Sequence, residues 1–215
     1  MGRTLRSLSV LALILMSVAC TTPQTPAATA SPAKVADTKA ALRDLWLGHI
    51  LGIRNVAVAT MDKNAAARES AEKSVVANAQ QIAGSIEPFY GKAASDKLFT
   101  LLAGHYGAIR DDLDATVAGN AAQQEAAIKT LTANAGEIAT FLSGANPYLP
   151  KDAVMGLLTA HAAHHLQQFQ QLKAGEYVQE AETWNGMKKH IYVVADALTG
   201  ALAHSFPPSS DRGRS

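Results

Sequence analysis

The chain has 215 residues, of which 48% are hydrophobic and 17% are charged, and its formal net charge is +1 at pH 7. This near-neutral chain has no basic cluster, which argues against nucleic-acid binding, because that activity needs concentrated positive charge. Cys20 is the only cysteine, so the sequence excludes an internal disulfide and a thiolate zinc cluster.

The first 19 residues have the features of a signal peptide. Two arginines within the first six residues precede an apolar run, Leu8 to Val18, that is too short to span a bilayer comfortably. The run ends in Ser17-Val18-Ala19-Cys20, which resembles the lipobox of bacterial lipoproteins. That resemblance implies cleavage before Cys20 and lipidation of its thiol. The alternative is an ordinary secretory signal in which the cysteine occurs by chance.

The lipoprotein interpretation makes Cys20 a membrane anchor. Residues 20–36, rich in Thr, Pro and Ala, then form a flexible tether, and residues 205–215 form a disordered tail. The folded part is expected to span residues 37–204, the length of a single domain. The protein would then be exported and held in the cell envelope, on the periplasmic side or at the cell surface.

A comparison of the chain with itself at a shift of 56 residues indicates internal repeats. Residues 45–86 and 101–142 share 18 identities in 42 positions without a gap, while 101–142 and 157–198 share only 8. Self-similarity at a fixed interval is typical of a repeat protein. We therefore expect three units, at about residues 37–91, 92–147 and 148–204.

Each unit is predicted to be a helical hairpin. Apolar residues recur at helical spacing on both sides of a short turn, and the loops between units contain proline and glycine. The turns fall at Lys63-Asn64, Gly119-Asn120 and Gly175-Glu176, where glycine suits the end of one helix and asparagine the start of the next. The expected fold class is all-α, an antiparallel bundle of six helices with roughly 20–27 residues each.

Polar residues recur on the apolar stripes of both helices. His49, His105 and His161 lie on the first helices, and Asn78, Asn134 and His190 lie at the same height on the returning helices. The simplest interpretation is structural: each histidine forms a hydrogen bond across its hairpin, and the pairs fix helix packing. The arginines five residues after the first two histidines, Arg54 and Arg110, are expected to be solvated or to snorkel, with the charged group reaching water.

The third unit also supports a binding-site interpretation. His161 and His165 are four residues apart on one helical face, and His190 should be level with His161. These three imidazoles would suit zinc or copper. The sequence has no HExxH motif, which argues against a zinc protease. A small organic ligand held at the same polar layer is an open alternative.

The run from Ala133 to Pro147 adds a resemblance. Over about residues 45–198 the chain is similar to small uncharacterised all-helical bacterial proteins, which also carry histidines where His49, His105 and His161 stand. The resemblance implies a helical fold and no established activity.

Together these features predict an exported, lipid-anchored helical bundle that is a non-enzymatic metal-binding or small-ligand-binding module. One alternative is a purely structural or partner-binding envelope lipoprotein, whose protein partner the sequence does not identify. The third is an enzyme of unknown reaction, which would need acids such as Glu137 or Asp196 to line a cavity at the histidine layer.

Overall fold

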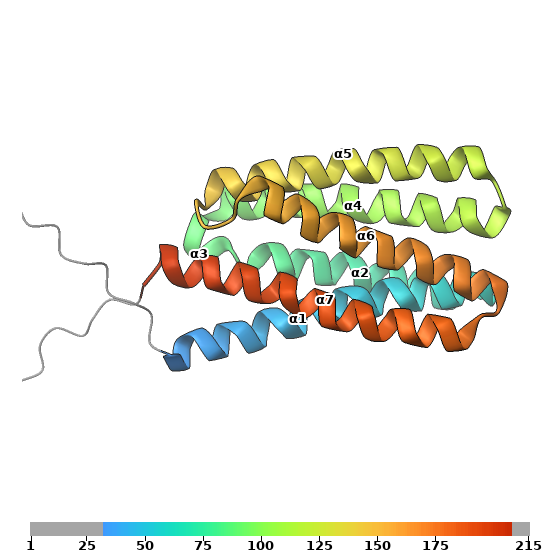
Figure 1. The fold of residues 1–215 in the computed structure, drawn as a ribbon, viewed down its shortest axis with the longest axis horizontal. Helices are drawn as coiled ribbons and strands as arrows, with labels where there is room; N and C mark the ends of the chain where they lie inside the picture. The colour runs from blue at the N-terminus through green and yellow to red at the C-terminus, as the bar shows by residue number, and fades with distance from the viewer. Residues whose placement is uncertain (1–31, 208–215) are drawn as a thin grey trace, which may run out of the picture.

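The computed structural model describes residues 32–207, and in this part of the chain the fold is entirely helical (Figure 1). The signal peptide, Cys20 and residues 208–215 lie outside the described residues. No helix in the described part is both long enough and apolar enough to cross a membrane. The helices are α1 (Pro32–Met61), α2 (Ala65–Gly84), α3 (Glu87–Tyr90), α4 (Lys92–Ala118), α5 (Ala121–Ala145), α6 (Lys151–Ala174) and α7 (Tyr177–Ser205).

The expected all-α antiparallel bundle is confirmed, with two local differences. The helix α1 begins at Pro32, so it takes in five residues that were expected in the tether. Proline is favoured in the first turn of a helix, because the N–H that it lacks has no helical partner there. The loop around Pro88 contains one helical turn, α3, for the same reason.

The turns within the hairpins form as predicted. The side chains of Asn64 and Asn120 each accept a hydrogen bond from the backbone N–H three residues further along, at 3.0 and 3.1 Å. Gly119 and Gly175 end their helices in the left-handed conformation, with φ of 69° and 73°. Lys63 adopts the same conformation at the first turn, with φ of 54°. These caps set where each chain reversal occurs.

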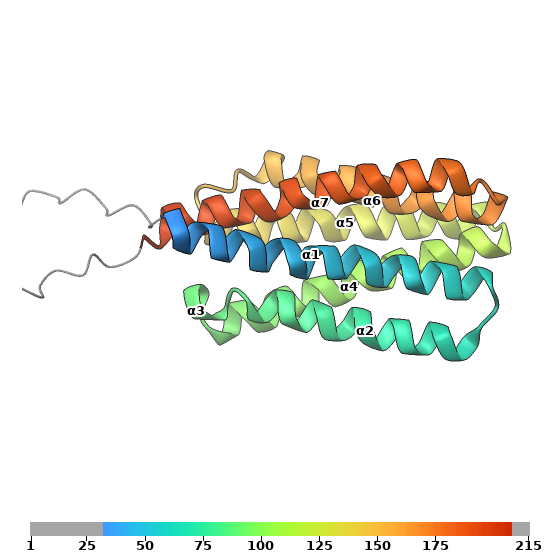
Figure 2. The same ribbon diagram turned by 90° about the horizontal axis from the view of Figure 1, so that it is seen from below.

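The three hairpins form a ring in which the first helix of each hairpin lies on the inside and the returning helix lies on the outside. The first helices α1, α4 and α6 all contact one another. Each returning helix packs against two of them: α2 against α1 and α4, α5 against α4 and α6, and α7 against α6 and α1. Figures 1 and 2 show these long helices running side by side along the whole bundle. Residues in the middle of α1, α4 and α6 therefore face a common interior.

Candidate functional site

The inner helices bring three histidines together halfway along the bundle. His49 of α1, His105 of α4 and His161 of α6 are 5%, 3% and 2% exposed. The Nε2 atoms of His49 and His161 are 3.3 Å apart, so one ring donates a hydrogen bond and the other accepts it. One ring nitrogen from each of the three histidines lies within 4.8 Å of the other two. Among residues 32–207, this is the one cluster with a geometry suited to a metal ion.

The polar residues of the returning helices hydrogen-bond to backbone instead of to these imidazoles. In each hairpin a side-chain nitrogen donates to the carbonyl oxygen of the residue four positions before the histidine. The three bonds are Asn78 Nδ2 to Leu45 O at 3.0 Å, Asn134 Nδ2 to Leu101 O at 3.0 Å, and His190 Nε2 to Leu157 O at 2.9 Å. The predicted side-chain bond across each hairpin is therefore replaced by a bond to a backbone carbonyl, while the Nε2 atoms of His49 and His161 bond to each other.

Glycine makes room for two of these bonds. A Cβ atom at Gly48 would lie 3.0 Å from Asn78 Nδ2, and one at Gly104 would lie 3.2 Å from Asn134 Nδ2. Such separations are tighter than ordinary van der Waals contact, so a side chain at either position would push the amide away from its carbonyl acceptor. The Gly-His sequence of the first two hairpins thus serves the backbone bond as well as the histidine.

The observed trio differs from the predicted metal ligands His161, His165 and His190. The Nε2 atom of His190 is occupied by the Leu157 carbonyl, and the rings of His190 and His161 stack with their centroids 6.5 Å apart. His165 is fully buried, and its centroid is 4.6 Å from that of His161. Neither nitrogen of His165 has a hydrogen-bond partner. The observed trio therefore contains His49 and His105 in addition to His161, and does not contain the predicted ligands His165 and His190.

Burial keeps the clustered imidazoles neutral. Desolvation, reinforced by repulsion from His105, lowers the pKa of His49 to about 3. Desolvation lowers the pKa of His105 to about 4, and the nearby Asn134 amide acts in the opposite direction. Burial, followed by repulsion from neighbouring histidines, holds the pKa of His161 and of His165 well below 6.5. At pH 7 all four rings are uncharged, and a neutral imidazole is the form that binds metals.

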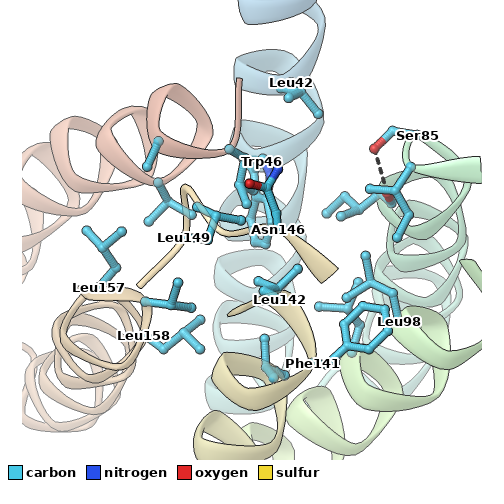
Figure 3. A pocket seen from close by; sticks show the side chains of 18 of the residues that line it. Leu42, Trp46, Ser85, Leu98, Phe141, Leu142, Asn146, Leu149, Leu157 and Leu158 are labelled. Carbon is cyan, nitrogen blue, oxygen red and sulfur yellow. Dashed lines mark hydrogen bonds between the residues drawn. The ribbon is translucent and has the colours of Figure 1, made fainter. Parts of the chain in front are cut away.

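The trio borders an apolar cavity of about 70 Å³ that extends to the end of the bundle. Figure 3 shows the leucines around this space, with Leu157 and Leu158 of α6 on one side and Leu98 of α4 on the other. The lining contains no Asp, Glu, Lys or Arg, so Glu137 and Asp196 do not reach the cavity. Asp196 instead pairs with Arg43, which donates two hydrogen bonds of 2.8 and 2.7 Å to its carboxylate.

The polar groups at the far end of the cavity are bonded to one another. Asn146 Nδ2 donates to Tyr90 Oη at 2.8 Å, and the backbone N–H of Tyr148 donates to Asn146 Oδ1 at 2.9 Å. Trp46 lines the cavity and meets the ring of His49 edge-on, with the ring centroids 5.8 Å apart. Its Nε1 is buried without a hydrogen-bond partner. Its helical spacing of three residues from His49 was the available signal for this position.

The interior on the turn side of the trio contains charged residues that the sequence analysis did not single out. Glu180 is 2% exposed and accepts two hydrogen bonds from Arg54, at 2.7 and 2.8 Å, and one from Gln168 at 3.0 Å. The side chain of Arg54 is 32% exposed, but its guanidinium pairs with a buried carboxylate, which the sequence did not predict. Arg110 is more exposed and lies beside Asp111. Asp112 is 1% exposed, and neither carboxylate oxygen has a partner. Burial raises the pKa of Asp112 to about 6.

Comparison with protein-family models, curated proteins and solved structures finds no match for this chain. The function must therefore be argued from the geometry and chemistry of the histidine site.

Proposed function

We propose that the protein binds one transition-metal ion through ring nitrogens of His49, His105 and His161, as a non-enzymatic binding module. The observation that carries this proposal is that three neutral, buried imidazoles from three different helices approach within 4.8 Å. Two ligands of a tetrahedral ion with metal–nitrogen bonds of about 2.0–2.1 Å lie about 3.3 Å apart. The separation of 3.3 Å between the Nε2 atoms of His49 and His161 matches this value.

The hydrogen bonding argues against a purely structural role for the trio. Asn78, Asn134 and His190 already hold each hairpin in register through backbone carbonyls, without the help of these histidines. Burying an unpartnered polar group costs about 1–3 kcal/mol, so apolar side chains would stabilise the layer better. The Nδ1 atoms of His105 and His161 carry this cost, because neither has a hydrogen-bond partner, and the free energy of metal binding at the trio would offset it.

The setting of the module remains a prediction from the sequence. Signal-peptide features and the lipobox-like Ser-Val-Ala-Cys20 support export and a lipid anchor in the cell envelope. The runner-up is an envelope lipoprotein whose histidine layer serves packing or an unidentified protein partner. A small organic ligand is less well supported, because about 70 Å³ is far below the roughly 300 Å³ of a pocket for drug-sized ligands.

The decisive experiment is metal binding by the full chain, purified without a histidine tag and freed of metal with a chelator. Titrations with copper, zinc, nickel and cobalt are expected to show one ion per chain and a higher melting temperature when the ion is bound. The H105A and H161A variants should lose binding on the order of 10- to 100-fold. H164A is the matched control, because His164 lies on the same helix but is not one of the trio.

If no ion binds to the wild-type protein, the metal proposal fails. It also fails if H164A weakens binding as much as H161A does. Circular dichroism melts of each variant separate a lost ligand from a lost fold.

A further inference from the structure

We propose that the histidine trio selects copper(I), held by three imidazole nitrogens, over zinc(II) and copper(II). This inference rests on the proposed metal-binding function and adds the charge and identity of the ion. The juxtaposition that carries it is a trio of uncharged ligands at the edge of an apolar cavity without any acidic lining residue.

The first argument concerns charge. The cost of transferring an ion from water into a medium of low dielectric constant grows with the square of its charge, so a divalent ion pays about four times as much as a monovalent ion of equal radius. Buried divalent ions are therefore commonly accompanied by carboxylates or thiolates, which neutralise them. The cavity lining offers neither, and its 24 residues include no Asp, Glu or Cys. Three neutral imidazoles leave the full charge of the ion uncompensated, which favours the ion with a single charge.

The second argument concerns the number of ligands. Zinc(II) in proteins takes four ligands, so a site with three histidines needs a water molecule in the fourth position, and copper(II) prefers a tetragonal set of nitrogen and oxygen atoms. The cluster supplies three nitrogens, and its neighbours on the cavity wall are largely leucine, isoleucine and valine. The oxygen-bearing side chains of the lining, Ser85, Tyr90 and Asn146, form hydrogen bonds of their own. A d¹⁰ monovalent ion is satisfied by three donors and needs no further oxygen ligand.

His165 does not alter this preference. Its ring adjoins that of His161, with the centroids 4.6 Å apart, but His165 is outside the group whose nitrogens lie within 4.8 Å of one another. The ring is neutral, so even a movement that brought it to the ion would add no negative charge.

The test is a competition experiment under anaerobic conditions on the full chain. Copper(I), kept reduced with ascorbate, is titrated against the chromophoric chelator bicinchoninate, and zinc(II) is titrated against a pyridylazo dye. We expect one copper(I) per chain, bound on the order of 100-fold more tightly than zinc(II), because the charge penalty is larger for the divalent ion. X-ray absorption should report a reduced ion with three nitrogen neighbours.

A matched pair of variants tests the charge argument directly. Leu102 lines the cavity three residues before His105, so L102D introduces a carboxylate there, and L102N introduces a side chain of similar size without the charge. Relative to L102N, the aspartate should shift the preference toward zinc(II) by on the order of 10-fold.

The outcomes separate this inference from the proposed function. If zinc(II) or copper(II) binds the wild-type protein as tightly as copper(I), the choice of ion is wrong while the metal site stands. An unchanged preference in L102D, when it folds as L102N does, overturns the charge argument. If none of these ions binds, both proposals fail.

Discussion

The histidine layer separates two halves of the interior that differ in packing and polarity. Toward α3 and the α5–α6 loop, the interior is hollow and its lining carries no charged side chain. Toward the three hairpin turns, Ile53, Ile109, Leu113 and Phe169 fill the interior and are each no more than 2% exposed. This packed half nevertheless contains the Arg54–Glu180 ion pair and the unpartnered carboxyl of Asp112.

The difference shows where the bundle can accept a ligand. In the packed half, the carboxylate of Glu180 is already neutralised by hydrogen bonds from Arg54 and Gln168. In the hollow half, the uncharged imidazoles border about 70 Å³ of space. Four sets of measurements test this contrast.

Acid should destabilise the metal-free protein through the histidine layer. Unfolded histidines titrate near pH 6.5, whereas the folded pKa is about 3 for His49 and about 4 for His105. Well above pH 6.5 these histidines are neutral in both the folded and the unfolded chain, so they do not reduce the free energy of unfolding. Below pH 6.5 the unfolded chain takes up protons that the folded chain does not. At pH 5 each such histidine therefore lowers the free energy of unfolding by about 2 kcal/mol. Urea unfolding at pH 7.5 and pH 5 measures the loss.

Between pH 7.5 and pH 5, the free energy of unfolding of an H105N variant should fall by about 2 kcal/mol less than that of the wild type, since one titrating group has been removed. Equal losses in the two proteins would show that His105 is already protonated or exposed in the folded state.

Breaking the ion pair of the packed half should have the next largest effect. R54A leaves the carboxylate of Glu180, whose side chain is only 3% exposed, without its cation. Removing one partner of a buried pair costs about 3 kcal/mol. The arginine at the equivalent position of the second hairpin, Arg110, is 44% exposed, and R110A should cost less than about 0.5 kcal/mol. Chemical denaturation at pH 7.5 measures both; similar costs for the two variants would mean that Glu180 is protonated or solvated.

Enlarging a leucine should affect the two halves differently. Leu113 lies in the packed half and is 1% exposed, so L113F should destabilise the bundle by about 2 kcal/mol through overpacking. Leu158 lines the cavity, where the added ring atoms have space, and L158F should change stability by less than about 0.5 kcal/mol. Thermal melts of the pair report the difference, and a larger loss for L158F would indicate that the cavity is filled.

The smallest effect is expected at Asp112. Because burial raises its pKa from 3.8 to about 6, the folded state holds this proton more tightly than the unfolded state does. Stability from this group is therefore present at low pH and is lost as the pH rises from about 4 to 6. The shift of about two pKa units makes the effect of D112N differ by about 2 kcal/mol between pH 4 and pH 7.5. Because the amide itself lacks partners at every pH, D112N should stabilise the protein by about 1 kcal/mol at pH 7.5 and destabilise it by about 1 kcal/mol at pH 4. A gain that is independent of pH would contradict this explanation.

Local patterns in the sequence predicted most of the fold. The helical spacing of apolar residues located six long helices, and Gly119, Asn120 and Gly175 marked the turns. The repeated units remain an interpretation of the sequence, although the bonds from Asn78, Asn134 and His190 recur at the same interval of 56 residues.

The site was predicted only in part, because its assembly depends on contacts between distant helices. Spacing placed His49, His105 and His161 at one height, but it also suggested partners within each hairpin. Nothing in the local pattern indicates that α1, α4 and α6 meet on the inside. The cluster of His161 with His165 and His190 looked stronger because those residues are close in sequence, whereas the observed trio spans residues 49 to 161.

The ring of helices would make the proposed metal binding a property of the completed chain. Each hairpin supplies one histidine, and the ring closes only when α7 packs against α1. A chain that stops before α6 therefore carries two of the three nitrogens and leaves α1 without its last neighbour. Saturation with metal would then report that the whole polypeptide has been synthesised and has folded, which a spectroscopic measure of helix content alone cannot establish.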